Sequence, residues 1–132
     1  VNRLFTAMVK EGTDETKAAA ATIMFAPETL KNHPETAAEY AKISMKHPAS
    51  TDILIKQSQA IQEFDTWERL PEITALTLAL GADKDVLIPQ ENLKILADRI
   101  PNAKLLLIKG GGHQVLVEQA DACNTAITDF LT

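Results

Sequence analysis

The chain has 132 residues, of which 45% are hydrophobic and 23% are charged, a composition that suits a single soluble globular domain. Its net charge of −5 and its scattered lysine and arginine residues argue against nucleic acid as a partner. No apolar run approaches the roughly 20 residues that a membrane span needs, so no membrane partner is expected. A single cysteine and the lack of a visible signal peptide favour a cytoplasmic protein.

The first 64 residues are predicted to form four helices separated by glycine and proline. The first helix has apolar residues at helical spacing and ends at Gly12, and Thr13 is the predicted N-cap of the second. Pro27 stops the second helix, and Pro34 can occupy the first turn of the third. The expected ranges are residues 1–12, 14–25, 34–45 and 52–64.

Beyond residue 64 the hydrophobic pattern changes from that of helices to that of buried strands. Near-continuous apolar runs at Ile73–Leu80 and Leu105–Ile108 predict two strands that are covered on both faces. Residues 90–99 have apolar positions at helical spacing, and so does the end of the chain, where Cys123 lies on the apolar face. The order β-loop-α-β-loop-α indicates an α/β fold with a parallel strand pair and a right-handed crossover.

A sheet of only two parallel strands is incomplete, because both of its edges carry unpaired N–H and C=O groups. We therefore expect the missing strands to come from another chain or from a segment outside this sequence. The open edge is also expected to make the isolated chain associate with a copy of itself or with the missing N-terminal half.

Two loops that follow the predicted strands carry candidate catalytic side chains. The loop at residues 81–89 contains Asp83 and Asp85, and the other loop contains three glycines followed by His113. Because the carboxyl ends of parallel strands meet at one edge of a sheet, a carboxylate and the imidazole can form a hydrogen bond there. Such a pair holds the imidazole in one tautomer and activates a nucleophile, usually a serine hydroxyl. On residue types alone, either aspartate could be the partner, and His113 could instead be a structural capping residue.

These two loops resemble the C-terminal end of an α/β-hydrolase. In that family an aspartate after the penultimate strand precedes a proline by four residues, as Asp85 precedes Pro89 here. A glycine-rich turn and a histidine follow the last strand, often with a glutamate five residues later, and residues 111–113 and Glu118 match that pattern.

The resemblance covers about half of the chain and implies a partial α/β-hydrolase fold. A helical cap would occupy residues 1–64, and the C-terminal part of the hydrolase core would occupy residues 65–132. By the same resemblance Asp85 is the triad acid, since the spacing to the proline favours it over Asp83, and His113 is the general base. No cofactor and no metal ion is implied.

The nucleophile of that family lies in a G-x-S-x-G turn between a strand and a helix. No such turn can be written here, because the five glycines lie at positions 12, 81, 110, 111 and 112. The resemblance therefore implies the C-terminal part of a serine hydrolase of esterase or lactonase type, inactive alone, with a small hydrophobic ester-like substrate in the full-length protein. The alternative is a non-catalytic binding or association module built on the strand–Gly-Gly-Gly–helix unit, which could hold a phosphate.

Overall fold

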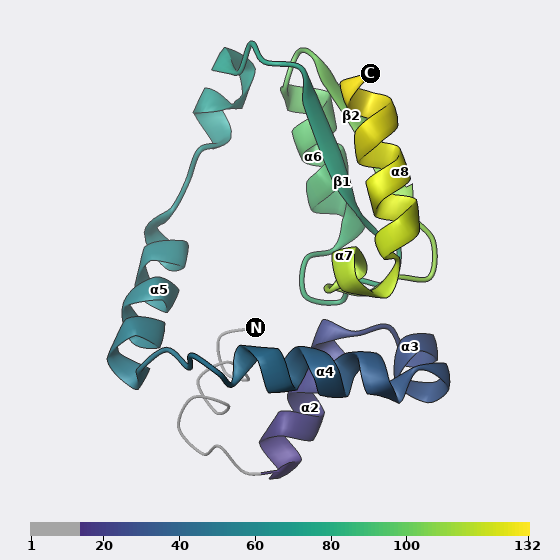
Figure 1. The fold of residues 1–132 in the computed structure, drawn as a ribbon. Helices are drawn as coiled ribbons and strands as arrows, with labels where there is room; N and C mark the ends of the chain where they lie inside the picture. The colour runs from purple at the N-terminus through teal and green to yellow at the C-terminus, as the bar shows by residue number, and fades with distance from the viewer. Residues whose placement is uncertain (1–13) are drawn as a thin grey trace.

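The computed structural model describes residues 14–132, and Figure 1 shows how their elements are arranged. The predicted first helix and the predicted N-cap Thr13 lie outside the described residues. In chain order the elements are α2 (Asp14–Met24), α3 (Pro27–Asn32), α4 (Pro34–Ser44), α5 (Thr51–Glu63), the 3-10 helix η1 (Trp67–Glu72), β1 (Thr77–Ala82), α6 (Gln90–Arg99), β2 (Ala103–Ile108), α7 (Val115–Glu118) and α8 (Ala120–Leu131).

The two strands form a parallel pair, as the sequence predicts. The register sets residues Thr77–Ala82 of β1 opposite residues Ala103–Ile108 of β2, one to one. Helix α6 makes the crossover between them, and α7 and α8 follow β2. The structure therefore has the α/β arrangement of a partial α/β-hydrolase fold, with helices first and a β-α-β-α unit after them (Figure 1).

Helices α6 and α8 lie on opposite faces of the strand pair (Figure 1). On one face the lack of a side chain at Gly81 lets Leu93 of α6 lie directly against β1. On the other face Cys123 of α8 packs with Ala82 and Val115 in a small core. Cys123 is 1% exposed, which confirms its predicted core position, and burial raises the pKa of its thiol.

Strand β1 begins four residues later than predicted and ends two residues later. The apolar run does not pair from Ile73 onward, because the preceding residues form the 3-10 helix η1, which contains Pro71. The first β1 amide bonded toward β2 is that of Thr77, which donates to the Asn102 carbonyl at 3.1 Å. The Asn102 side chain donates to the Thr74 carbonyl at 3.2 Å and so holds the chain just before the strand.

Three short helices were missed in the sequence. The sequence predicts only the end of a helix at Pro27, but α3 begins there, because proline also suits the first turn of a helix. Helix η1 is held in place by Arg99, a residue outside it. The Arg99 guanidinium lies 3.9 Å from the centre of the Trp67 ring and donates to the Trp67 carbonyl at 3.0 Å. Helix α7 has only four residues and joins the loop after β2 to α8.

The helices before the sheet do not cover its faces. Helices α2, α3 and α4 lie at the carboxyl end of the strands, next to the loop after β2, and α5 stands apart from the sheet (Figure 1). Ser50 caps α5 by accepting a hydrogen bond from the Ile53 amide at 3.5 Å. The apolar side of α5 is nevertheless exposed: Ile61 is 75% accessible, and Phe64, the residue after the helix, is 73% accessible.

Two absences hold for the described part of the chain. None of its helices combines the length and the apolar character that crossing a membrane requires. Among the side chains that the structure describes there is also no group of three or more His, Cys, Asp or Glu that could hold a metal ion.

Candidate functional site

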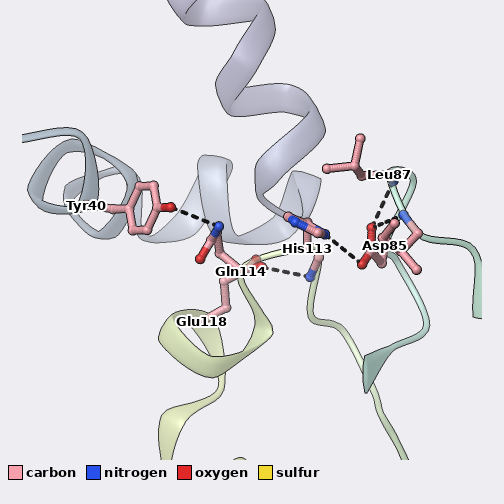
Figure 2. Close-up of polar contacts among 8 residues, drawn as sticks. Tyr40, Asp85, Leu87, His113, Gln114 and Glu118 are labelled. Atoms are coloured by element: carbon pink, nitrogen blue, oxygen red, sulfur yellow. Dashed lines mark hydrogen bonds and ion pairs between the residues drawn. The ribbon is translucent and has the colours of Figure 1, made fainter. Parts of the chain in front are cut away.

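The loops after β1 and β2 bring Asp85 and His113 together at the carboxyl edge of the sheet. The Nδ1 atom of His113 lies 3.0 Å from Oδ2 of Asp85, and Figure 2 shows the two side chains facing each other. The Asp85 side chain is 12% exposed and the His113 side chain 28% exposed, so the pair is sheltered and the imidazole retains access to solvent. The two residues that the sequence singled out are thus in contact.

The second oxygen of Asp85 is held by its own loop. Oδ1 accepts hydrogen bonds from the amides of Leu87 at 2.8 Å and Ile88 at 2.9 Å. An aspartate that accepts from amides two and three residues later forms a local turn, and the turn fixes the direction of the carboxylate. One oxygen of Asp85 is therefore committed to the backbone, and the other faces His113 (Figure 2).

Asp83, the rival acid in the sequence, has a different position. Its Oδ1 accepts a hydrogen bond from the Gly110 amide at 2.7 Å, and its Oδ2 lies 3.8 Å from Nζ of Lys84. Gly110 has a φ of +78°, in the left-handed region that favours glycine. Because the Gly110 amide donates to Asp83, this aspartate stabilises the sharp turn after β2. The structure places Asp85, and not Asp83, against the imidazole.

At Gly111 and Gly112 the turn is packed too tightly for a side chain. A Cβ at Gly111 would lie 2.7 Å from a methyl carbon of Val115. A Cβ at Gly112 would lie 2.5 Å from the Ala26 nitrogen and 2.7 Å from the Phe25 carbonyl carbon. The junction between α2 and α3 therefore rests directly on the backbone next to His113.

The residues around His113 also hold contacts that sequence reasoning missed. Gln114 donates from its amide to the Met24 carbonyl at 2.9 Å and from Nε2 to the Tyr40 hydroxyl at 3.0 Å. Tyr40 in turn packs edge-to-face on Phe25, with ring centres 5.5 Å apart. Only the spacing of Glu118 from His113 gave a signal in the sequence, and its contacts are described below.

The contacts around the three glycines make a phosphate site there unfavourable. A phosphate site of that kind needs free backbone amides at the start of a helix. Here the Gly112 amide donates to the Glu118 carboxylate at 2.8 Å, and a carboxylate at that point would repel an anion. The helix that follows, α7, is four residues long.

A histidine held by an aspartate at Nδ1 has a defined chemical capacity. When the Nδ1–H group donates a hydrogen bond to Asp85, the neutral ring has no proton on Nε2, and Nε2 can accept one from a neighbouring hydroxyl. None of the three described serines is a hydrogen-bond partner of His113: Ser44 is the last residue of α4, Ser50 caps α5, and Ser58 accepts a hydrogen bond from Gln62 at 3.3 Å.

Comparison with known families and proteins adds the context of the fold. Residues 56–132 match the family described as TAP-like protein, an α/β-hydrolase family. RutD of Stutzerimonas stutzeri (strain A1501), named as a carbamate hydrolase, is 34% identical over 88 residues, which are 67% of this chain and 33% of that protein. RutD of Caulobacter sp. (strain K31) is 36% identical over 83 residues, which are 63% of this chain and 31% of that protein.

Solved structures show the same fold over nearly the whole chain. The enol-lactonase from Burkholderia xenovorans LB400 superposes with a TM-score of 0.84 at 19% identity, over 98% of this chain and 48% of that one. The bromoperoxidase from Bacillus anthracis gives a TM-score of 0.82 at 22% identity, over 98% and 47%. The chain thus spans about a third of the curated relatives that it matches and about half of these structures.

Proposed function

Because the chain belongs to the TAP-like family of α/β-hydrolases, we propose that Asp85 and His113 are the acid and the base of a catalytic triad. The observation that carries this proposal is the 3.0 Å contact between His113 Nδ1 and Asp85 Oδ2 at the strand ends. The substrate of the complete polypeptide is an ester, lactone or carbamate, since all three have an acyl carbon that an activated hydroxyl can attack.

The proposed roles follow from the geometry of the pair. Nε2 of His113 takes the proton from a serine hydroxyl as its oxygen attacks the acyl carbon, and then gives that proton to the leaving group. Asp85 accepts a hydrogen bond from the Nδ1–H group throughout, without taking the proton, and stabilises the imidazolium that forms in between. Water releases the acyl group in a second round with the same base.

The nucleophile and the oxyanion hole are proposed to lie on a segment outside these 132 residues. In support, the sequence contains no G-x-S-x-G turn. The superposed structures are about twice as long as the matched region, which leaves room for such a segment in a complete hydrolase. The 132-residue chain by itself is then proposed to be inactive.

Residues 1–64 are proposed to be the cap of the active site, and residues 65–132 the C-terminal part of the core. The cap proposal rests on the position of α2, α3 and α4 at the carboxyl edge of the strands, where Tyr40 reaches the histidine loop (Figure 2). The aromatic pair of Phe25 and Tyr40 near this edge favours a small hydrophobic acyl substrate.

A fluorophosphonate probe tests the proposed function in the complete polypeptide that carries these residues. We expect the probe to label one serine, and His113→Ala to slow labelling by at least about 10³-fold, because the hydroxyl loses its base. The triple variant Ser44→Ala, Ser50→Ala, Ser58→Ala is the matched control and should be labelled at the normal rate. Labelling of one of those three serines, or none at all in a folded protein that also cleaves no ester, would remove the proposal.

The partner proposed for this chain is the segment that completes the sheet, with a second copy as a substitute when that segment is lacking. Since the Thr77 amide bonds to β2 and successive amides alternate, the Leu78 amide points to the open edge of β1. Exposed apolar side chains on α5 and just after it, such as Ile61 and Phe64, add surface that a partner can cover.

Sedimentation of the isolated 132-residue chain tests the open edge. We expect an average mass above 14.4 kDa that rises with concentration, because unpaired strand edges add strands. Leu78→Pro should reduce the association, since proline removes an amide that does not bond to β2. Ala79→Pro is the control that breaks the β1–β2 ladder and should lose native circular dichroism. A cooperative, concentration-independent monomer would contradict the proposal.

A further inference from the structure

We propose that Glu118 is a positioning residue for His113, because its carboxylate ties the histidine loop to the junction of α2 and α3. This inference rests on the proposed function, since positioning matters to catalysis only if His113 is the base. The hydrogen-bond partners of Glu118 include neither the His113 imidazole nor Asp85.

The carboxylate of Glu118 joins two segments that are far apart in the sequence. Oε2 accepts hydrogen bonds from the Ala26 amide at 2.8 Å and the Thr29 hydroxyl at 2.6 Å. Oε1 accepts from the Gly112 amide at 2.8 Å. Ala26 is 0% exposed, Thr29 is 7% exposed and Gly112 is buried, so the charge-assisted bonds are sheltered from water.

Glu118 serves α3 in place of a local cap. Ala26 is the N-cap residue of α3 and makes no side-chain cap hydrogen bond of its own. In a capping box, the third helical residue reaches back to the N-cap amide. Here the third helical residue is Thr29, and it donates instead to Glu118, which also takes the N-cap amide. The start of α3 is therefore secured only while Glu118 stays in place.

Both neighbours of His113 are anchored to the same junction. The Gly112 amide is held by Glu118, and the Gln114 amide donates to the Met24 carbonyl at 2.9 Å. The backbone of His113 is thus fixed on either side, and Asp85 then sets the direction of the ring. In Figure 2 Gln114 and Glu118 lie on the opposite side of His113 from Asp85.

Replacing Glu118 with glutamine tests the hydrogen bonds of this side chain apart from its volume. Glutamine has the shape of glutamate, but it offers one acceptor oxygen and a donor NH₂ group. If the oxygen faces Ala26 and Thr29, the NH₂ group faces the Gly112 amide and that bond is lost. If the amide group turns over, the Ala26 amide loses its acceptor instead, while the Thr29 hydroxyl can accept from the NH₂ group. Either way one backbone amide loses its hydrogen bond to residue 118, and the link between the two segments is weakened with little change in volume.

The experiment uses the complete polypeptide with Glu118→Gln, and Glu91→Gln on the exposed surface of α6 as the matched control. We expect Glu118→Gln to lower kcat on an ester by about tenfold or more with KM changed less than about threefold, because the base is displaced. The NMR signals of the His113 ring nitrogens should shift in Glu118→Gln and stay unchanged in Glu91→Gln.

Thr29 gives a second, milder pair of variants if Glu118→Gln does not fold. Thr29→Val removes one donor to Glu118 and should shift the His113 signals in the same direction, whereas Thr29→Ser keeps the hydroxyl and should restore them. An active wild type with kcat and His113 signals unchanged in folded Glu118→Gln, or in Thr29→Val, overturns the inference and leaves the proposed function standing. A folded wild type that the fluorophosphonate probe does not label and that cleaves no ester removes the proposed function, and the NMR signals still decide the link.

Discussion

Replacing Asp85 with asparagine is expected to lower kcat of the complete polypeptide on an ester by about 10⁴-fold, because His113 is left in the wrong tautomer. The structure gives the reason. The amides of Leu87 and Ile88 both donate to Oδ1, so in the variant the acceptor oxygen must stay there. The NH₂ group then faces Nδ1 of His113, and the ring proton moves to Nε2, where the base is needed. Initial rates with p-nitrophenyl butyrate measure the effect.

Asp83→Asn is the matched control for that experiment. The side-chain oxygen of asparagine can still accept the Gly110 hydrogen bond that Asp83 accepts, so we expect kcat within about threefold of the wild type. The thermal midpoints of both variants show whether they are folded. A large loss in Asp83→Asn together with a small loss in Asp85→Asn would mean that the acid has been assigned to the wrong aspartate.

Gly112→Ala is expected to lower the free energy of unfolding by about 3 kcal/mol, at the upper end of the usual range for overpacking. The added Cβ would lie 2.5 Å from the Ala26 nitrogen and 2.7 Å from the Phe25 carbonyl carbon. Those are backbone atoms, which cannot rotate away as a side chain can. Urea denaturation of the variant, followed by circular dichroism, measures the loss.

Two other glycines calibrate this result. A Cβ at Gly81 meets the end of the Leu93 side chain, which can change rotamer, so Gly81→Ala should be less destabilising than Gly112→Ala. A Cβ at Gly110 would lie at an ordinary contact distance of 4.0 Å from Nε2 of Gln119, so Gly110→Ala should show mainly the strain of its left-handed backbone, about 1 kcal/mol. If Gly112→Ala were the mildest of the three, the close contact with the α2–α3 junction would be refuted.

The parts of the structure that the sequence predicted are those with a local pattern. The two strands follow from short apolar runs, and the Asp85–His113 contact follows because parallel strands end at one edge. The strand start was misplaced because the apolar residues near Ile73 follow the 3-10 helix η1 without pairing. Apolar character alone does not show where a strand begins when neighbouring residues set the direction of the chain.

The contacts of Glu118 could not be predicted from the sequence. They join residues 89 and 92 positions apart, and no periodic pattern records such a pairing. The same holds for Tyr40, which meets Gln114 across 74 positions. Helix α3 was missed for a related reason: its N-cap is Ala26, and the group that secures it comes from the other end of the chain.

The two kinds of contact around His113 also differ in how hard they are to form from an unfolded chain. The contact with Asp85 closes a loop of 28 residues, whereas the Glu118–Ala26 bond closes one of 92. The entropy of loop closure grows as the logarithm of loop length, so the longer loop costs about 1 kcal/mol more. We therefore expect the acid–base pair to form at a lower entropic cost than the contact that docks α2 and α3 on the histidine loop.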